Sequence, residues 1–145
     1  MKITILTIAF VAMSLTAISC SKDDGDTTKP SINLSTPAHD QVLKIGDPAG
    51  VLLEMDLSDD VMLGSYKLEV HSNADHHEHS LKSEGNTDFS FHKEYDISGN
   101  KSIHISHNDI VIPAGVTEGE YHLMVYCTDA AGNETQVARD IILRN

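Results

Sequence analysis

The sequence predicts an all-β protein, an immunoglobulin-like antiparallel β-sandwich of about seven strands. From Pro30 onward, apolar and polar residues alternate in short runs that turn residues separate, and no convincing helix is present. About seven such runs with turn signals between them are typical of this sandwich. Aromatic residues make up 5% of the chain and tryptophan is absent, so we expect a mainly aliphatic core.

The expected strands follow one another with short connections. They are SINLST (31–36), VLLEMDL (51–57), GSYKLEVHS (64–72), FSFHKEYDI (89–97), SIHIS with its continuation DIVIP (102–113), GEYHLMVYCT (119–128) and TQVARDIIL (135–143). No second hydrophobic block and no repeat is evident. We therefore expect one sandwich domain over residues 30–145.

The sixth expected strand carries the clearest alternation. Tyr121, Leu123, Val125 and Cys127 share one face, and His122 shares the other with Met124 and Tyr126. Gly-x-Tyr at the start of this strand resembles the tyrosine corner of the sandwich fold. Residues 129–133, DAAGN, then indicate a hairpin turn. We expect Cys127 to lie inward as a small apolar residue, with a reactive or ligand thiol as the alternative.

The N-terminus has the pattern of a targeting segment. A short positive start and an apolar run lead to AISC, which ends at Cys20 and is followed by the acidic stretch SKDDGD. This resembles the lipobox of bacterial lipoproteins, although Ala17 stands where leucine is more usual. The resemblance implies a signal peptide over 1–19 and a lipidated acidic tether over 20–29. An ordinary secretory signal with a chance cysteine is the alternative.

Charge and cysteine content limit the partners. The formal net charge of −12 argues against nucleic acid, whose phosphates the chain would repel. It also argues against electrostatic docking on anionic lipid, so the lipid on Cys20 would do the anchoring. With Cys20 committed to lipid, Cys127 is the only other cysteine, and no intrachain disulfide is expected.

Three segments carry a resemblance to a known family. SDDVMLGSYKLEVHSNADHHEHS, IVIPAG and GEYHLMVYCTDAAGNE resemble an uncharacterised lipoprotein family of the Bacteroidota, domain of unknown function 4625, over nearly all of residues 29–145. The resemblance implies an immunoglobulin-like fold and an outer-membrane lipoprotein that the acidic tether directs to the cell surface. It supplies no activity. Histidines at the positions of His71, the 76–79 cluster and His122 resemble those of the family, which favours a shared role.

VHSNADHHEHS (70–80) raises the question of a metal site. On the third expected strand, the inward direction of Tyr66, Leu68 and Val70 turns His71 outward. The third and sixth strands of such a sandwich are antiparallel neighbours, so His71 and His122 are expected to form a cross-strand pair. Two imidazoles so placed can converge on one ion.

The loop after the third strand begins at the same end of the sandwich. We expect its His76, His77 and His79 to complete a Zn²⁺ or Cu²⁺ site, with His107 sharing this end. A polar loop whose imidazoles charge together below about pH 6.5 is the alternative. The other histidines, His39, His92 and His104, are expected to be solvated.

The opposite end carries a second candidate ion site. Asp56, Asp59 and Asp60 lie in DLSDD, and Asp129 begins the turn after the sixth strand. Carboxylates with backbone carbonyls bind Ca²⁺. Their spacing is not that of an EF-hand, and acidic turns are common, so we favour a structural turn role over calcium.

These features favour a metal-binding lipoprotein of the cell surface, one that delivers its metal to an outer-membrane receptor. The alternative is a non-catalytic adhesion or protein-interaction module, for which the fold is the only argument. An enzyme is not expected, because HExxH, a nucleophile elbow and a phosphate loop are all absent. The oligomeric state is left open.

Overall fold

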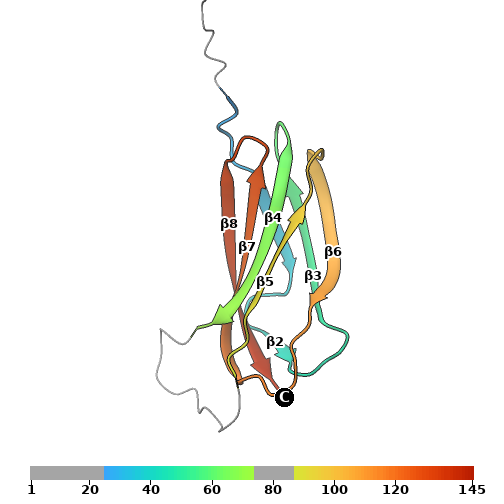
Figure 1. Cartoon of the computed structure of the whole chain (residues 1–145), viewed down its shortest axis with the longest axis vertical. Helices are drawn as coiled ribbons and strands as arrows, with labels where there is room; N and C mark the ends of the chain where they lie inside the picture. The colour runs from blue at the N-terminus through green and yellow to red at the C-terminus, as the bar shows by residue number, and fades with distance from the viewer. Residues whose placement is uncertain (1–24, 74–86) are drawn as a thin grey trace, which may run out of the picture.

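The protein is a β-sandwich. The computed structural model describes residues 25–73 and 87–145. One sheet has the strand order β1-β3-β6 and the other has the order β2-β8-β7-β4-β5 (Figure 1). The strands are β1 (Ser31–Thr36), β2 (Gln41–Lys44), β3 (Val51–Ser58), β4 (Leu63–Ser72), β5 (Phe91–Asp96), β6 (Ser102–Ile110), β7 (Gly119–Asp129) and β8 (Glu134–Arg144). The predicted all-β sandwich is confirmed, and each expected strand has a counterpart.

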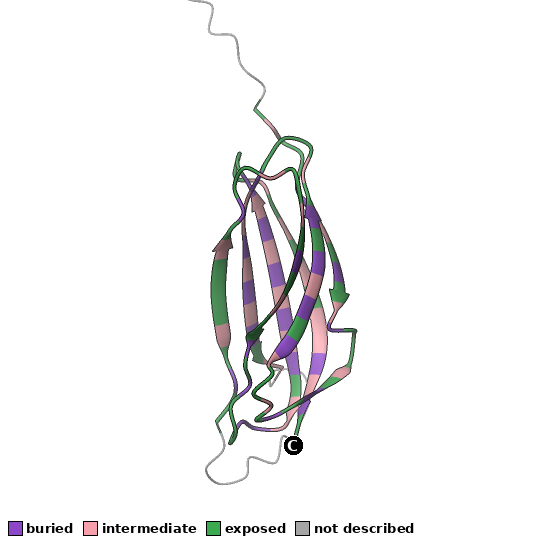
Figure 2. Ribbon diagram, turned by 90° about the vertical axis from the view of Figure 1, so that its right-hand side faces the viewer, coloured by how far each residue is buried: buried purple, intermediate pink, exposed green. Residues whose placement is uncertain are grey.

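The core lies between the two sheets and is mainly aliphatic. Buried residues alternate with more exposed ones along the strands, most regularly on β3 and β7 (Figure 2). Leu53 and Met55 from the smaller sheet and Leu68 and Val125 from the larger one are all 0% exposed. This burial supplies the driving force for folding, because apolar surface removed from water stabilises by roughly 25 cal/mol per Å².

A tyrosine corner closes the core at the start of β7. Tyr121 is 1% exposed, and its hydroxyl donates to the carbonyl of Thr117 at 2.9 Å. The same oxygen accepts from the backbone N–H of Phe89 at 3.3 Å. The sequence resemblance to a tyrosine corner is thus confirmed in its hydrogen bonding.

Strand β2 is the element that alternation alone does not predict. It has four residues, of which only Leu43 is buried, so its pattern is too short to stand out. It pairs in parallel with β8, with Gln41 opposite Ile141, and the N–H of Asp40 donates to the carbonyl of Asp140 at 2.8 Å. The chain therefore crosses from one sheet to the other after β1 and brings residues 39–40 to the edge of β8.

Two other expected elements differ in detail. The fifth strand was expected to run to residue 113, but β6 ends at Ile110 and the following Ile112 is buried outside any strand. The fourth strand was expected over 89–97, but β5 spans only Phe91–Asp96, and it pairs with β4. His92 therefore lies opposite Glu69 on the larger sheet.

The pairing of β4 with β7 defines two ends of the sandwich. At one end His71 lies opposite His122, and at the other Leu63 lies opposite Asp129. We call these the histidine pole and the acidic pole. The described N-terminal residues 25–30 enter at the acidic pole, and β4 ends at the histidine pole (Figure 1). The predicted leader and Cys20 lie outside the described residues. Within residues 25–73 and 87–145, no helix has the length and apolarity to cross a membrane.

Candidate metal centre

His71 and His122 form the expected cross-strand pair. They are register partners on β4 and β7, and their ring centroids are 5.6 Å apart with planes inclined at 57°. Their neighbours Val70 and Leu123 are buried in the core, which directs both imidazoles to the outer face of the sheet. The predicted pairing is confirmed, whereas metal binding by the pair stays a prediction.

Asp140 orients the ring of His122. It is the register partner of His122 on β8, and its Oδ1 lies 2.6 Å from Nδ1 of His122. The carboxylate can only accept, so Nδ1 carries the hydrogen and the lone pair of a neutral ring falls on Nε2. A carboxylate that holds a histidine in this way is the usual outer partner of a metal-ligating imidazole.

His39 and Asp40 extend the row that His71, His122 and Asp140 form across the sheet. The sequence predicted a solvated position for His39, and its side chain is 60% exposed. Nδ1 of His39 lies 3.7 Å from Oδ2 of Asp140, and its Nε2 lies 3.6 Å from Oδ2 of Asp40. One potential ligand atom from each of His39, Asp40 and Asp140 falls within 4.8 Å of the other two. No local signal in the sequence indicates this cluster, because the parallel pairing of β2 with β8 assembles it.

The loop histidines His76, His77 and His79 lie outside the described residues. The flanking residues are held near the start of β7. The N–H of Asn73 donates to the carbonyl of Glu120 at 3.0 Å, and Thr87 is hydrogen bonded to Gly115 and Thr117. The connecting segment therefore leaves and rejoins the described chain close to the histidine pole.

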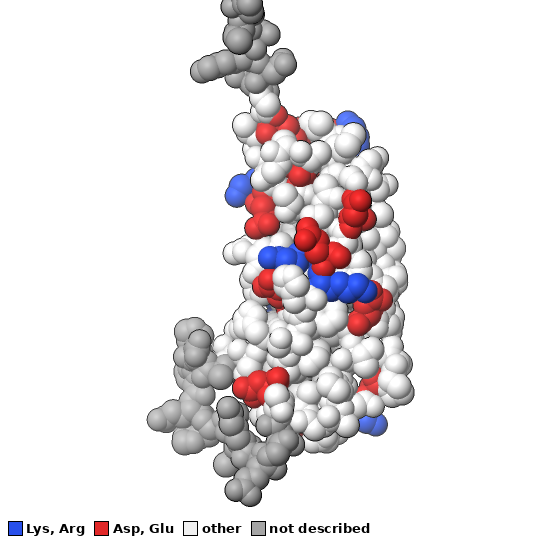
Figure 3. All heavy atoms as spheres, in the orientation of Figure 1, with Lys and Arg blue, Asp and Glu red and all other residues white. Residues whose placement is uncertain are grey.

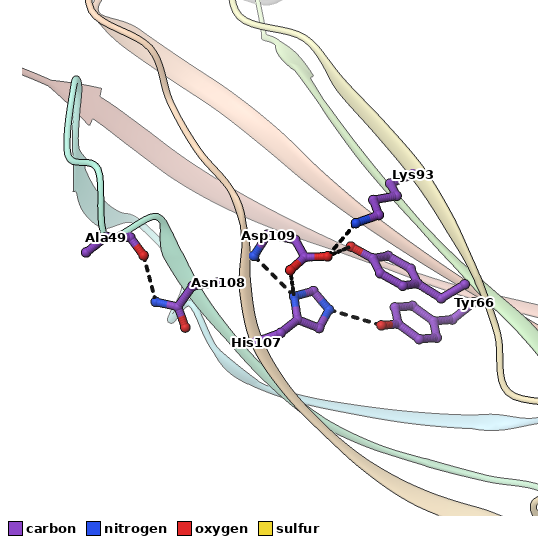
Figure 4. Close-up of polar contacts among 7 residues, drawn as sticks. Ala49, Tyr66, Lys93, His107, Asn108 and Asp109 are labelled. Atoms are coloured by element: carbon purple, nitrogen blue, oxygen red, sulfur yellow. Dashed lines mark hydrogen bonds and ion pairs between the residues drawn. The ribbon is translucent and has the colours of Figure 1, made fainter.

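His107 does not share the histidine pole, which corrects the expectation from the sequence. Its Nε2 lies 3.0 Å from the hydroxyl of Tyr66, and its Nδ1 accepts from the N–H of Asp109 at 3.3 Å. Tyr66 lies five positions before His71 on β4, or roughly 16 Å along a strand. Both ring nitrogens therefore have partners, and the contact with Tyr66 ties β6 to the larger sheet (Figure 4).

Asp109 completes this inter-sheet contact. Its Oδ2 accepts from Lys93 Nζ at 2.6 Å and from the Tyr95 hydroxyl at 2.8 Å, and the rings of Tyr66 and Tyr95 stack with centroids 4.5 Å apart. The Lys93 ammonium, and then the Tyr95 hydroxyl, hold the pKa of Asp109 below its usual range. We call residues 66, 93, 95, 107 and 109 the sheet clasp.

Replacing Asp109 by Asn is expected to lower the free energy of unfolding by about 1 kcal/mol at pH 7, since the carboxylate is partly exposed and its ion pair partly screened. A carboxyl whose pKa is lower in the folded chain stabilises fully above its unfolded pKa, and this contribution is lost as the pH falls through the folded value. The difference from wild type should therefore shrink as the pH falls below about 3.9, the ordinary pKa of an aspartate, and through the lower pKa of the folded chain. Urea unfolding at pH 7 and pH 2.5 measures it.

A Lys93→Met background serves as the control for this prediction. Because Lys93 is the main partner, Asp109→Asn should cost less in that background than in the wild type. An equal cost in both backgrounds would contradict the assignment of the ion pair as the source of the stability.

The acidic pole brings together only part of the carboxylate set considered for calcium. Asp59 and Asp60 lie together and are joined by Asp26, with one carboxylate oxygen from each within 4.8 Å of the others. Oδ2 of Asp59 is buried and has no hydrogen-bond partner among the described residues. Asp56 does not join them, because it points from the outer face of β3 toward His104, with Oδ1 and Nδ1 2.8 Å apart. Calcium binding at Asp59 and Asp60 stays the less favoured alternative to a structural turn role.

Asp129 has the structural turn role that we favoured. It is 4% exposed, and its Oδ1 accepts from the N–H groups of Ala131 and Asn133 at 2.9 and 2.8 Å. Oδ2 accepts from Nδ2 of Asn133 at 2.7 Å. Burial alone would raise the pKa of Asp129, but these hydrogen bonds outweigh it and hold the pKa below its usual range.

Cys127 is inward, as expected. It is 0% exposed, and burial, followed by the nearby carboxylates of Asp59 and Asp129, raises the pKa of its thiol to about 11. The thiolate is the form that attacks or binds metal. Cys127 is therefore a protonated core residue at neutral pH.

The outer face of the larger sheet carries paired charges. Acidic and basic side chains lie side by side across the middle of this face (Figure 3). Nζ of Lys67 lies 3.1 Å from Oε1 of Glu69, and the same oxygen lies 3.2 Å from Nδ1 of His92. His92 and His104 are 64% and 61% exposed at their side chains, which confirms their expected surface positions.

The fold and the site together define a class. The protein is a β-sandwich domain with a row of histidine and aspartate side chains on the outer face of its larger sheet, at one end. The chain matches the family model Domain of unknown function (DUF4625) over residues 18–144 and belongs to that family. A search of curated proteins found no match.

Proposed function

We propose that this protein is a cell-envelope lipoprotein whose histidine pole binds a transition metal, Zn²⁺ or Cu²⁺. The observation that carries the proposal is the register of three neighbouring strands of the larger sheet, β4, β7 and β8. This register aligns His71, His122 and Asp140. Both imidazoles stand on strand positions whose register is fixed before any ion binds. Preorganised ligands lose little conformational freedom on binding, which favours affinity.

The chemistry of the donors supports these ions. Neutral imidazole suits Zn²⁺ and Cu²⁺, and intrinsic affinity favours Cu²⁺ over Zn²⁺. The Asp140 carboxylate directs Nε2 of His122 outward as a lone-pair donor. Two strand histidines supply half of a tetrahedral set. The remaining donors would come from water and from the loop that carries His76, His77 and His79.

The arrangement of the ends supports a role away from the membrane. A lipid on Cys20 would hold the chain through the tether, which enters the domain at the acidic pole (Figure 1). The histidine pole would then project away from the anchor, toward a partner such as an outer-membrane receptor. The leader, the lipobox and the resemblance to Bacteroidota lipoproteins support an outer-membrane, surface-exposed location. The strand order supports an immunoglobulin-like fold.

Calorimetric titration with Zn²⁺ and Cu²⁺ tests the proposal. We expect the full-length protein, tag-free and stripped of metal, to bind saturably at micromolar concentrations. The double variant His71→Gln, His122→Gln should lose more than about 100-fold in affinity, since loss of an outer partner alone typically costs about 10–100-fold.

A matched double variant, His92→Gln with His104→Gln, controls for histidine content. It removes two exposed, carboxylate-paired histidines from outside the row and should bind like the wild type. The proposal fails if the wild type does not bind, or if both double variants bind with wild-type affinity.

A further inference from the structure

We infer that the histidine pole carries a second, more exposed metal position, formed by His39, Asp40 and Asp140. This inference deepens the proposed function and rests on it for the class of ion. One ligand atom from each of the three residues lies within 4.8 Å of the others. Tetrahedral Zn²⁺ with ligands at about 2.0–2.1 Å places its donors roughly 3.4 Å apart. His39 faces Asp140 with Nδ1 and Asp40 with Nε2, so its ring must turn to present one of these nitrogens to an ion that both carboxylates also reach.

The donor set is suited to Zn²⁺. It combines one imidazole nitrogen with two carboxylate oxygens, all of which are ligands of this metal in proteins. The carboxylates of Asp40 and Asp140 leave the cluster with net negative charge when His39 is neutral, and a dication would neutralise it. The fourth coordination position would be open to water.

The fold holds these residues together without a metal. The N–H of Asp40 donates to the carbonyl of Asp140 at 2.8 Å, and the N–H of Gln41 donates to the carbonyl of Ala38 at 3.2 Å. Asp40 has φ of +57° and is the only non-glycine residue with positive φ in the described parts of the chain. Aspartate and asparagine tolerate this conformation better than most residues, so Asp40→Asn removes the charge and keeps the turn.

Asp140 connects the two positions. Its Oδ1 lies 2.6 Å from His122, and its Oδ2 lies 3.7 Å from His39. The His39 and Asp40 side chains are 60% and 65% exposed, against 25% for His122. The second position is therefore the weaker and more exchangeable one, accessible to ions from solution, and it shares a carboxylate with the proposed site at His71 and His122.

Zn²⁺ titration of the full-length, metal-stripped protein tests this position. We expect two binding events in the wild type. His39→Gln and Asp40→Asn should each abolish the weaker event and leave the tighter one measurable, because both variants keep Asp140 as the partner of His122. Asp140→Asn should abolish the weaker event and weaken the tighter one by about 10–100-fold.

His104→Gln is the matched control. His104 also faces a carboxylate, Asp56 at 2.8 Å, but no third ligand accompanies that pair among the described residues. Both events should survive this change.

The outcomes separate the two proposals. A single event in the wild type, or a weaker event that survives His39→Gln, overturns the second position and leaves the first intact. A weaker event that depends on His39 and persists in the His71→Gln, His122→Gln variant supports the second position. If that double variant also keeps its tighter event, the function proposed for His71 and His122 is refuted separately.

Discussion

Replacing Asp129 by Ala is expected to lower the free energy of unfolding by about 3 kcal/mol, because a carboxylate that accepts several hydrogen bonds disappears from a buried turn. The N–H groups of Ala131 and Asn133, and Nδ2 of Asn133, would lose their acceptor. This turn joins β7 to β8, so its loss would also loosen the strands that carry His122 and Asp140.

Urea unfolding at pH 7 measures this loss, and Asp129→Asn provides the graded control. The asparagine oxygen can still accept from the two backbone N–H groups but lacks the charge, so its cost should be roughly half that of alanine. A cost for Asp129→Ala within about 0.5 kcal/mol of zero, typical of an indifferent surface site, would contradict the turn role.

Replacing Gly50 by Ala is expected to lower the free energy of unfolding by at least about 3 kcal/mol, through overpacking and a left-handed backbone together. Gly50 has φ of +73°, and a Cβ there would lie 2.3 Å from the carbonyl oxygen of Asn108. The carbonyl oxygen of Ile110 would be 3.2 Å away. Both obstacles are backbone atoms of β6, so the strand itself would have to shift.

Gly99→Ala separates the steric cost from the conformational one. Gly99 has φ of +85°, but nothing lies within 4 Å of a Cβ built there. Its replacement should cost about 1–2 kcal/mol from the left-handed backbone alone. Thermal melts followed by circular dichroism compare the two variants. Equal losses of stability would show that the close approach of β6 to Gly50 is unimportant.

The sequence by itself determined the sandwich and the central pair of the candidate site. Alternation turned Leu68 and Val70 inward on the third strand and Leu123 inward on the sixth, and all three are buried. Side chains alternate strictly in a strand, so His71 and His122 had to face outward. The antiparallel neighbour relation of these strands in a sandwich then predicted their register.

The sequence could not assign the parts that depend on long-range contacts. His39 and Asp140 are about a hundred positions apart and meet only because the chain crosses between sheets into β2. His107 follows an alternating pattern like other strand residues, yet a partner forty-one positions away, Tyr66, engages it in the sheet clasp.

The carboxylate cluster at the acidic pole also depends on a long-range contact. Local spacing grouped Asp59 with Asp60, but the third carboxylate, Asp26, comes from the segment before β1. Periodicity describes which face a side chain occupies and says nothing of which distant strand lies beside it. The tertiary structure therefore decided which histidines have carboxylate partners, and with that the composition of the candidate metal centre.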